Sequence, residues 1–443
     1  MKQFILFTLA AVLACGRTKA QIFSPLHVGG LGGYSAAGLV LSNNRLYGTM
    51  IDSTVFAVNT DGSNFTNLYN FTGGDDGSFP YASLLLSGNM LYGTASGRGA
   101  YGSGTIFRIN TDGTCFTNLH SFSARSPNSL GTYTNSDGAT PYTGLVLSGK
   151  NLYGTAYEGG TNGDGAVFAI NTDGTCFTNL HNFTGGSDGA SPYASLVLSG
   201  NILYGIASGG GNFNNGTIFA INTDGTGFTN LYEFTASDSG TNCDGANPAF
   251  SLILSDNTLY GTAYNGGRYG FGTVFAVNTD GTDFTNLHDF DYWDGEQPEA
   301  GCIVGNTLYG ATQGGGPPGY GLGTVFAINI DGTGFTTVYD FAPYFEGVWP
   351  NAGLIFSGNT LYGTSTSFEG QGAVFALSLG PIPLKIQTSA ENRILTWGNP
   401  AFSLQTASAL TGQWTTLSNA ASPYTVSATN AQSFFRLAYT NTP

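Results

Sequence analysis

The amino-acid sequence predicts an all-β protein whose main part is a seven-bladed β-propeller closed by an N-terminal strand. Three observations predict this fold class. The triplet Leu-Tyr-Gly occurs seven times along the 443 residues. Each triplet lies in a unit of about 50 residues that contains four β-type runs, which is typical of a propeller blade. One extra run precedes the first unit and the last unit lacks one, so the two ends of the chain together complete a ring.

The third unit shows the four runs most clearly, as TGLVLSG, NLYGTAY, GAVFAIN and FTNLHNF, which we name strands A to D. Apolar and polar residues alternate in these runs, and Gly, Asn and Asp bound them. The triplet lies in strand B of every unit, and its tyrosines are Tyr47, Tyr92, Tyr153, Tyr204, Tyr260, Tyr309 and Tyr362.

The two ends of the repeat region favour a closed ring over a β-solenoid. The segment IFSPLHV resembles a strand D, with His27 in the place of His181, whereas the seventh unit ends after its strand C, GAVFALS. Pairing these two segments leaves no open sheet edge, while a solenoid would leave both ends unpaired and in need of caps. We therefore expect the propeller over residues 21–379.

The first 20 residues are expected to be a secretory signal peptide. Lys2 precedes an apolar run from Phe4 to Cys15 that is too short to span a bilayer, and small residues allow cleavage after Ala20. Alternatively, Val12 to Cys15 resembles a lipoprotein box in which Cys15 is lipidated. Because no later apolar run has the length of a membrane helix, we expect a protein without a transmembrane helix in its mature chain, secreted or at the cell surface.

The pattern changes after residue 380. Six short β-type runs follow in residues 380–443 and predict a small β-sandwich of the immunoglobulin or fibronectin type, with Trp397 and Trp414 in its core.

Composition and repeat positions argue against several classes of site. Only 9% of the residues are charged and the formal net charge is -15 without a basic patch, so nucleic acid is not an expected partner. All four histidines occupy one strand-D position, where other units have tyrosine, and a metal ligand or catalytic base would not tolerate that exchange. Gly185 to Gly189 match Gly-x-Ser-x-Gly, but no helix follows them as a nucleophile elbow requires. No catalytic residue is predicted.

The cysteines after the leader allow one disulfide. Cys115 and Cys176 share one repeat position on adjacent blades, which should place their Cα atoms beyond the ~7 Å limit for a disulfide. They are predicted to be free thiols, and Cys243 with Cys302 is the remaining candidate pair.

Whole units such as LYGTAYEGGTNGDGAVFAINTDGTCFTNLHNFTGGSDGASPYASLVLSGN resemble the GloVer tandem repeat of secreted bacterial proteins termed "choice-of-anchor". The resemblance covers roughly residues 30–379. It implies an exported repeat protein and brings no catalytic residues with it.

One face of the ring is expected to carry the function. The A–B and C–D connections are short and nearly invariant, whereas the B–C and D–A connections are long and differ between blades, as binding loops do. The D–A loops share Asp-Gly-x-x-Pro, and this motif fits a turn followed by the start of an inner strand. A second interpretation is a ring that binds sugar hydroxyls or Ca²⁺, which prefers oxygen ligands. The acidic residues are Asp76, Asp137, Asp188, Asp244 and Asp294, with Glu346 in the seventh blade.

Aromatic residues in the same loops suggest a carbohydrate platform, because aromatic rings stack on sugar faces. They are Trp293 and Trp349 in D–A loops and Tyr101, Tyr269 and Tyr320 in B–C loops. The sequence thus predicts a monomeric, secreted or cell-surface, non-catalytic binding scaffold. Its partner would be a glycan, a component of the cell envelope or a protein, and no cofactor is expected apart from the Ca²⁺ alternative. The other hypothesis is an extracellular glycosidase or polysaccharide lyase that uses carboxylates such as Asp188 and Asp244.

Overall fold

The computed structural model describes most of the repeat region and short parts of the remainder. The described residues are 22–28, 37–51, 53–317, 321–341, 348–350, 353–366 and 372–379, together with 385–388, 392–396, 402–407, 413, 415–417, 424–427 and 434–439. The predicted signal peptide, Cys15, Tyr320, Glu346, Trp397 and Trp414 lie outside them.

Every regular element in the described part of the chain is a strand, and seven antiparallel sheets form the blades of the propeller. Blades 1 to 3 consist of β2 (Val40–Ser42), β3 (Arg45–Met50), β4 (Thr54–Asn59) and β5 (Thr66–Asn70); of β6 (Leu85–Ser87), β7 (Met90–Ala95), β8 (Thr105–Asn110) and β9 (Thr117–Ser121); and of β12 (Val146–Ser148), β13 (Asn151–Ala156), β14 (Ala166–Asn171) and β15 (Thr178–Asn182). Blades 4 and 5 consist of β16 (Val197–Ser199), β17 (Ile202–Ala207), β18 (Thr217–Asn222) and β19 (Thr229–Glu233), and of β20 (Ala246–Pro248), β21 (Ile253–Ser255), β22 (Thr258–Asn265), β23 (Thr273–Asn278) and β24 (Thr285–Asp289). Blade 6 contains β25 (Glu296–Val304), β26 (Thr307–Gly314), β27 (Thr324–Asn329) and β28 (Thr336–Asp340). Blade 7 contains β29 (Val348–Pro350), β30 (Ile355–Ser357), β31 (Thr360–Thr366), β32 (Gly372–Ser378) and β1 (Ile22–Val28).

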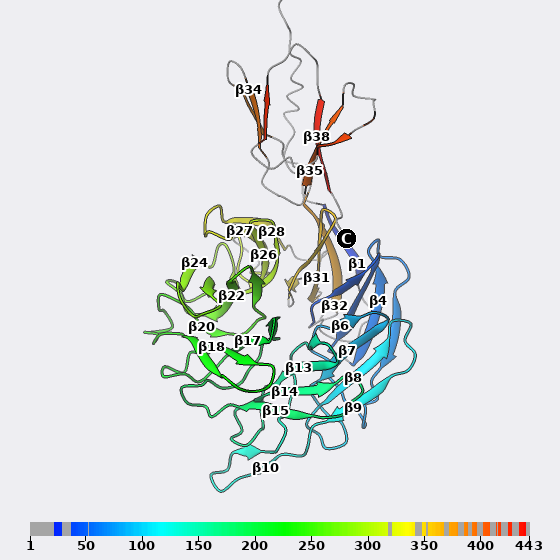
Figure 1. The fold of residues 1–443 in the computed structure, drawn as a ribbon, viewed down its shortest axis with the longest axis vertical. Helices are drawn as coiled ribbons and strands as arrows, with labels where there is room; N and C mark the ends of the chain where they lie inside the picture. The colour runs from blue at the N-terminus through cyan, green and yellow to red at the C-terminus, as the bar shows by residue number, and fades with distance from the viewer. Residues whose placement is uncertain are drawn as a thin grey trace, which may run out of the picture.

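The N-terminal strand closes the ring, as the chain ends predict. β1 pairs antiparallel with β32, from Ile22 opposite Ser378 to Val28 opposite Ala373. In Figure 1 the blue β1 lies beside β32 in the last blade. β1 takes the outer position that strand D has in the other blades. The seventh blade therefore also has strands in the positions A, B, C and D.

The Leu-Tyr-Gly triplet and the phenylalanine of strand C repeat together because they pack against each other. In the third blade Gly154 is paired with Phe168, and a Cβ atom added to Gly154 would lie 2.6 Å from Phe168 Cζ. The other six blades have the same pair with distances between 2.3 and 2.7 Å. The ring of the phenylalanine therefore occupies the space that a side chain on strand B would need.

The hydrophobic core lies between neighbouring blades. Tyr47 and Phe71 of blade 1, for example, belong to one buried cluster with Leu91 and Phe107 of blade 2. The strand-D position that holds His or Tyr adds a second contact, because each of these rings stacks on a phenylalanine of the next blade. The seven stacked pairs are Tyr339–Phe23, His27–Phe65, Tyr69–Phe116, His120–Phe177, His181–Phe228, Tyr232–Phe284 and His288–Phe335.

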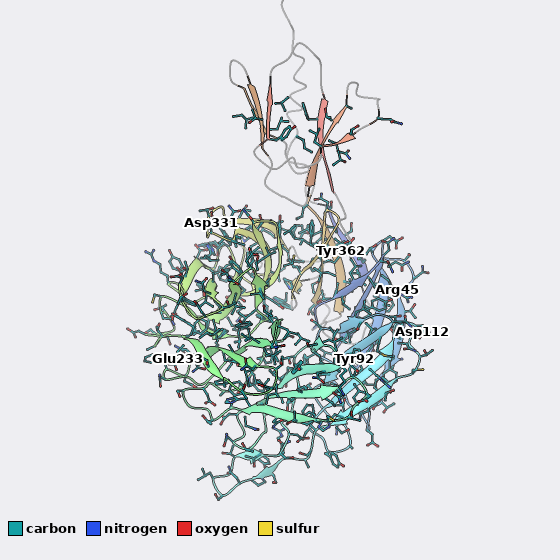
Figure 2. The ribbon with its side chains drawn as sticks, viewed as in Figure 1. Arg45, Tyr92, Asp112, Glu233, Asp331 and Tyr362 are labelled. Atoms are coloured by element: carbon teal, nitrogen blue, oxygen red, sulfur yellow. The ribbon has the colours of Figure 1, made fainter. Side chains whose placement is uncertain are left out.

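The short connections lie together on one face. The backbone N–H of Thr172 in the C–D turn donates to the carbonyl of Lys150 in the A–B turn at 2.8 Å, and equivalent bonds recur in the other blades. In the C–D turn Asp173 accepts hydrogen bonds from the backbone N–H and hydroxyl of Thr175. The equivalent aspartates Asp112 and Asp331 lie at the outer margin of the ring (Figure 2).

Three features depart from four simple strands per blade. Short strands β20 and β29 precede strand A in blades 5 and 7, and they pair with the far end of strand B. The D–A connection between blades 2 and 3 contains a small hairpin, β10 (Ser126–Pro127) with β11 (Tyr133–Thr134). In blade 6 the segment that precedes strand A is continuous with strand A, and together they form the single strand β25. These additions all belong to the long-loop face.

Two three-stranded sheets follow the propeller. One contains β33 (Lys385–Thr388), β34 (Asn392–Thr396) and β37 (Tyr424–Ser427), and the other contains β35 (Phe402–Ala407), β36 (Thr415–Thr416) and β38 (Phe434–Tyr439). That these sheets pack as a sandwich stays a prediction, as do the domain limits at 20, 379 and 380. No helix within the described residues has the length and apolar character needed to cross a membrane.

Candidate functional site

The aspartates of the D–A loops are structural partners of strand D. In the third blade His181 Nε2 lies 3.0 Å from Asp188 Oδ2, and Asp188 also accepts the backbone N–H of Thr184. Tyrosine does the same where histidine is absent, since the Tyr232 hydroxyl donates to Asp244 Oδ2 at 2.8 Å. The remaining pairs are Tyr69–Asp76, His120–Asp137 and His288–Asp294, at 2.9, 2.9 and 2.8 Å.

In the first blade these hydrogen bonds also favour the charged form of Asp76. Burial raises the pKa of Asp76, but hydrogen bonds from Thr72, Tyr69 and Gly74 outweigh it and hold that pKa below its usual value. Burial, together with the bond to Asp76, raises the pKa of Tyr69 to about 12. Asp76 is thus an ionised acceptor that is already engaged by donors of its own blade.

This arrangement does not fit a calcium site or a catalytic pair. Ca²⁺ needs six or more oxygen ligands, whereas each described D–A aspartate belongs to a different blade and holds its own loop. Among the described residues no three His, Cys, Asp or Glu side chains come together as metal ligands. Asp188 and Asp244 each form a hydrogen bond with the strand-D residue of their own blade, His181 or Tyr232. The interpretation of the motif as a structural turn therefore explains both aspartates.

The aromatic residues predicted as a platform are exposed, but they are spread over several loops. The exposed fractions are 60% for Tyr101, 49% for Tyr269, 58% for Trp293 and 40% for Trp349. Trp293 makes an edge contact with Tyr292, with ring centroids 5.8 Å apart. Trp349 lines a shallow hollow of about 280 Å³ together with Glu296, Gln297 and Gln313.

A cavity in the described part of the chain lies where the inner strands of the ring meet. Its volume is about 480 Å³, within the usual range for small-molecule sites. Two repeat positions supply most of its lining. The residue after the D–A proline contributes Tyr81, Tyr142, Tyr193, Ala249 and Glu299, and the end of strand B contributes Ile51, Tyr157, Ser208, Tyr264 and Gln313.

The residue before each of these prolines has a left-handed backbone conformation, and this conformation orients the residue after the proline toward the cavity. In blade 3 the N–H of Thr140 donates to the carbonyl of Ser103 in the preceding blade, and the carbonyl of Thr140 accepts the N–H of Tyr157. These bonds hold Tyr142 and Tyr157 near each other although the backbone conformation is uncommon for residues other than glycine. The residues before the prolines have φ between 51 and 58°, and they are Phe79, Thr140, Ser191, Asn247, Gln297 and Trp349.

Tyrosines form one continuous wall of the cavity. The ring centroid of Tyr142 lies 5.2 Å from that of Tyr81, 5.5 Å from that of Tyr157 and 5.3 Å from that of Tyr193. Further round the ring, Tyr264 contacts Phe250 and donates its hydroxyl to Gln313 Oε1 at 3.3 Å. Burial raises the pKa of Tyr193 to about 12, so the hydroxyl of this residue stays uncharged at neutral pH.

Glu299 is the one carboxyl group among the described lining residues. It lies in β25, its exposed fraction is 8%, and its Oε2 has no hydrogen-bond partner among the residues that the structure describes. Burial raises the pKa of Glu299 to about 8, although a hydrogen bond from the backbone of Gly353 opposes this shift. The side chain is therefore mainly protonated at neutral pH.

Small residues narrow the ring beside the cavity. Gly38, Ser83, Gly144, Ser195 and Ser251 all belong to the start of strand A and line the cavity. The N–H of Gly144 donates to Ser195 Oγ at 2.8 Å, and the N–H of Ser195 donates to Ser251 Oγ at 3.2 Å. A Cβ atom on Gly38 would lie 2.5 Å from Ser83 Oγ, so the blades approach closely here.

The sequence analysis did not identify the cavity residues. A signal was present, because the residue after the proline of the D–A motif is Tyr in three units, Ala in one, Glu in one and Asn in one. The position was not identified because it directly precedes strand A, where packing of the strand alone explains the residue pattern.

The disulfide considered between Cys243 and Cys302 is not formed. Cys243 is an exposed free thiol in a D–A loop, whereas Cys302 is a free thiol in β25 that packs against a hydrophobic cluster with Tyr309. Cys115 and Cys176 are free as predicted, and both have φ near 57°. This left-handed turn position explains why other units have Asn, Asp or Gly there.

Comparison with known proteins agrees with the repeat and the fold. No curated protein matches the chain. Among solved structures, the WD40 β-propeller domain of Doa1 has a TM-score of 0.50 at 9% identity, covering 80% of this chain and 97% of that one. BamB from Moraxella catarrhalis (TM-score 0.43, 15% identity, 77% of this chain and 85% of that one) and the computationally designed Ika8 protein (0.43, 17%, 78% and 97%) are also similar. The likeness to the Doa1 domain supports the propeller fold alone.

Residues 128–306 match the family model described as the Gloeobacter/Verrucomicrobia repeat. These residues include all of blades 3, 4 and 5 and the strand β25 of blade 6, and the whole-unit resemblance in the sequence points to the same repeat. This part of the chain is therefore similar to the Gloeobacter/Verrucomicrobia repeat, in agreement with the resemblance to the GloVer repeat.

Proposed function

We propose that this protein is an exported, monomeric, non-catalytic scaffold that binds a glycan in the central cavity at its long-loop face. The observation that carries the proposal is the cavity of about 480 Å³ lined by residues that differ between otherwise similar blades. A repeated scaffold explains repeated residues, whereas a single site must be built from those that do not repeat. Export rests on the predicted leader and on the family resemblance.

A glycan suits the chemistry of the lining. Tyrosine faces stack on the apolar sides of sugar rings, while the polar groups of Asn247, Ser208 and Gln313 offer hydrogen bonds to hydroxyls. The exposed Trp349 lies beside the neighbouring hollow, and Gln313 borders both spaces. A chain longer than one sugar could therefore continue from the cavity toward Trp349.

The arrangement supports binding over hydrolysis. A glycosidase uses two carboxyl groups about 5 to 10 Å apart around the scissile bond. The described cavity lining contains one, Glu299, and the D–A aspartates proposed for the enzyme alternative are bound to strand D.

The test is a thermal-shift and calorimetric screen of the mature chain against neutral and charged oligosaccharides. The variant Tyr142→Ala should weaken binding of the responding glycan at least 10-fold, because it removes the centre of the tyrosine wall. The matched control Trp293→Ala removes an exposed ring outside the cavity and should leave affinity within about 2-fold.

The opposite pattern, with loss of binding in Trp293→Ala alone, would place the ligand on the outer loops instead. Release of reducing or unsaturated ends during incubation would favour the enzyme alternative.

A further inference from the structure

Glu299 is a group that the fold alone does not explain. The structurally equivalent residues in blades 2 to 4 are tyrosines and in blade 5 it is alanine, so the repeat does not require a carboxyl group here. A buried polar group without a full set of partners lowers stability. Glu299 has this cost, since its Oε2 lacks a partner among the described residues.

The surroundings of Glu299 favour positive charge. None of the described lining residues is Lys, Arg or His, so no side chain there neutralises the carboxylate. Tyr193 lies close enough to Glu299 for the carboxylate to contribute to its raised pKa. The faces of Tyr193, Tyr142 and Tyr157 carry partial negative charge, which attracts cations. The formal net charge of -15 acts in the same direction at long range.

From this juxtaposition we propose that the cavity selects ligands that carry an ammonium group. Glu299 forms an ion pair with the ammonium group, and the rings of the tyrosine wall surround it. The inference deepens the proposed glycan function and rests on it: the ligand class becomes an amino sugar or a similar amine-bearing residue. An ammonium group supplies the hydrogen-bond donors that Glu299 Oε2 lacks, and aromatic rings replace part of its lost hydration.

Binding of a cation must be linked to release of a proton. Because burial raises the pKa of Glu299 to about 8, the carboxyl group is mainly protonated in the empty cavity at pH 7. A cation binds the ionised form, so affinity should rise about 10-fold per pH unit below pH 8 and level off above it. The titratable groups that share the cavity are Tyr81, Tyr142, Tyr157, Tyr193 and Tyr264, with Glu296 beside Tyr264.

The experiment compares matched probes by isothermal titration calorimetry on the mature chain. Choline is compared with 3,3-dimethylbutan-1-ol, a neutral molecule of the same shape, and glucosamine with glucose. At pH 8 choline, which is permanently charged, should bind at least 10-fold more tightly than its neutral counterpart, and glucosamine should bind more tightly than glucose. Titration of choline at pH 7 in buffers of different ionisation enthalpy should show release of close to one proton per bound probe.

Two variants isolate the role of the carboxyl group. Glu299→Gln keeps the shape but should abolish both the preference for the cation and the proton release. The control Glu233→Gln, which changes a carboxylate of β19 outside the cavity lining, should retain both. Equal binding of cationic and neutral probes, or an unchanged preference in Glu299→Gln, would overturn the inference.

The two proposals can fail separately. Binding of neutral glycans that depends on Tyr142 but not on Glu299 would leave the glycan function standing and reject the ammonium site. Absence of any binding that Tyr142→Ala or Glu299→Gln alters would reject both.

Discussion

Buried and partly buried carboxyl groups in this protein have two opposite environments. Asp76 accepts hydrogen bonds from the backbone and side chain of Thr72 and from Tyr69, so its charged form is stabilised. Glu299 is more deeply buried, has an unpartnered Oε2 within the described structure and favours its neutral form. Residue type alone does not distinguish these cases, because donors decide which form is stable.

The raised pKa of Glu299 predicts a pH dependence of stability. Between the ordinary pKa of a glutamate and about 8, the folded protein holds a proton on Glu299 that the unfolded chain has lost. The contribution of this group to the free energy of unfolding therefore falls by about 1.4 kcal/mol per pH unit as pH rises from 5 to 8.

Glu299→Gln should be close to wild type near pH 5 and increasingly more stable toward pH 8. Urea unfolding of both proteins at four pH values measures the difference, and the histidines, common to both, cancel. A constant difference across this range would mean that Glu299 ionises normally in the folded state.

The interchange of His and Tyr at the strand-D position predicts a second outcome. His181→Tyr should change the free energy of unfolding by less than about 1 kcal/mol, because Tyr232 makes the same stack and the same aspartate bond in the next blade. His181→Phe keeps the stack on Phe228 but removes a donor from Asp188, and it should cost about 1–3 kcal/mol. Equal costs for both variants in urea unfolding would show that the bond to Asp188 contributes little.

At the scale of the blade, close packing of strands B and C determines which residues repeat. Gly154 faces Phe168 and Leu145, and neither neighbour has room to move because both are buried. The threonine after this glycine adds a link to the next blade, as when the Thr49 hydroxyl donates to the carbonyl of Ala82. The Leu-Tyr-Gly-Thr sequence is thus a packing rule that acts within and between blades.

A single added methyl group tests this packing. Gly154→Ala should destabilise the protein by roughly 1–3 kcal/mol, since its Cβ would lie 2.6 Å from Phe168 Cζ. The control Gly209→Ala also has a negative φ, and its Cβ would meet Ala190 Cβ at an ordinary 3.8 Å. It should be neutral to within about 1 kcal/mol. Similar losses for both variants in urea unfolding would contradict the packing explanation.

For the whole molecule, stability depends on closing the ring. β1 supplies the outer strand of the last blade, and its Phe23 stacks on Tyr339 while His27 stacks on Phe65. These contacts connect the last blades to the first. A ring without β1 would expose the edge of β32 and the neighbouring apolar rings.

Deletion of residues 22–28 from the mature chain should therefore lower the free energy of unfolding by more than about 4 kcal/mol. A protein that lacks only residues 1–20 is the control and should have full stability. Partial recovery on adding a synthetic peptide of residues 22–28 would show that the strand acts by pairing. A deletion variant that melts like the control would mean that ring closure does not need β1.

The sequence by itself determined the number of blades, the four-strand pattern, ring closure and the face with variable loops. These properties follow from local rules repeated seven times. The alternation of apolar and polar residues, the turn residues and the Gly–Phe pair are each visible as a pattern in the sequence. The sequence also indicated a structural role for the His or Tyr position and, as one of two interpretations, for the Asp motif, although it did not show that they bond to each other.

Only the tertiary structure revealed the cavity and the position of Glu299 in it. Tyr142 and Glu299 are separated by three blades in the sequence, and the ring brings both to one cavity. Their chemistry depends on what surrounds them. Burial without a full set of hydrogen-bond donors raises the pKa of Glu299, and contacts between the rings combine separate tyrosines into one aromatic surface. No local pattern records such relations, because they arise from distances between segments that the closed ring alone defines.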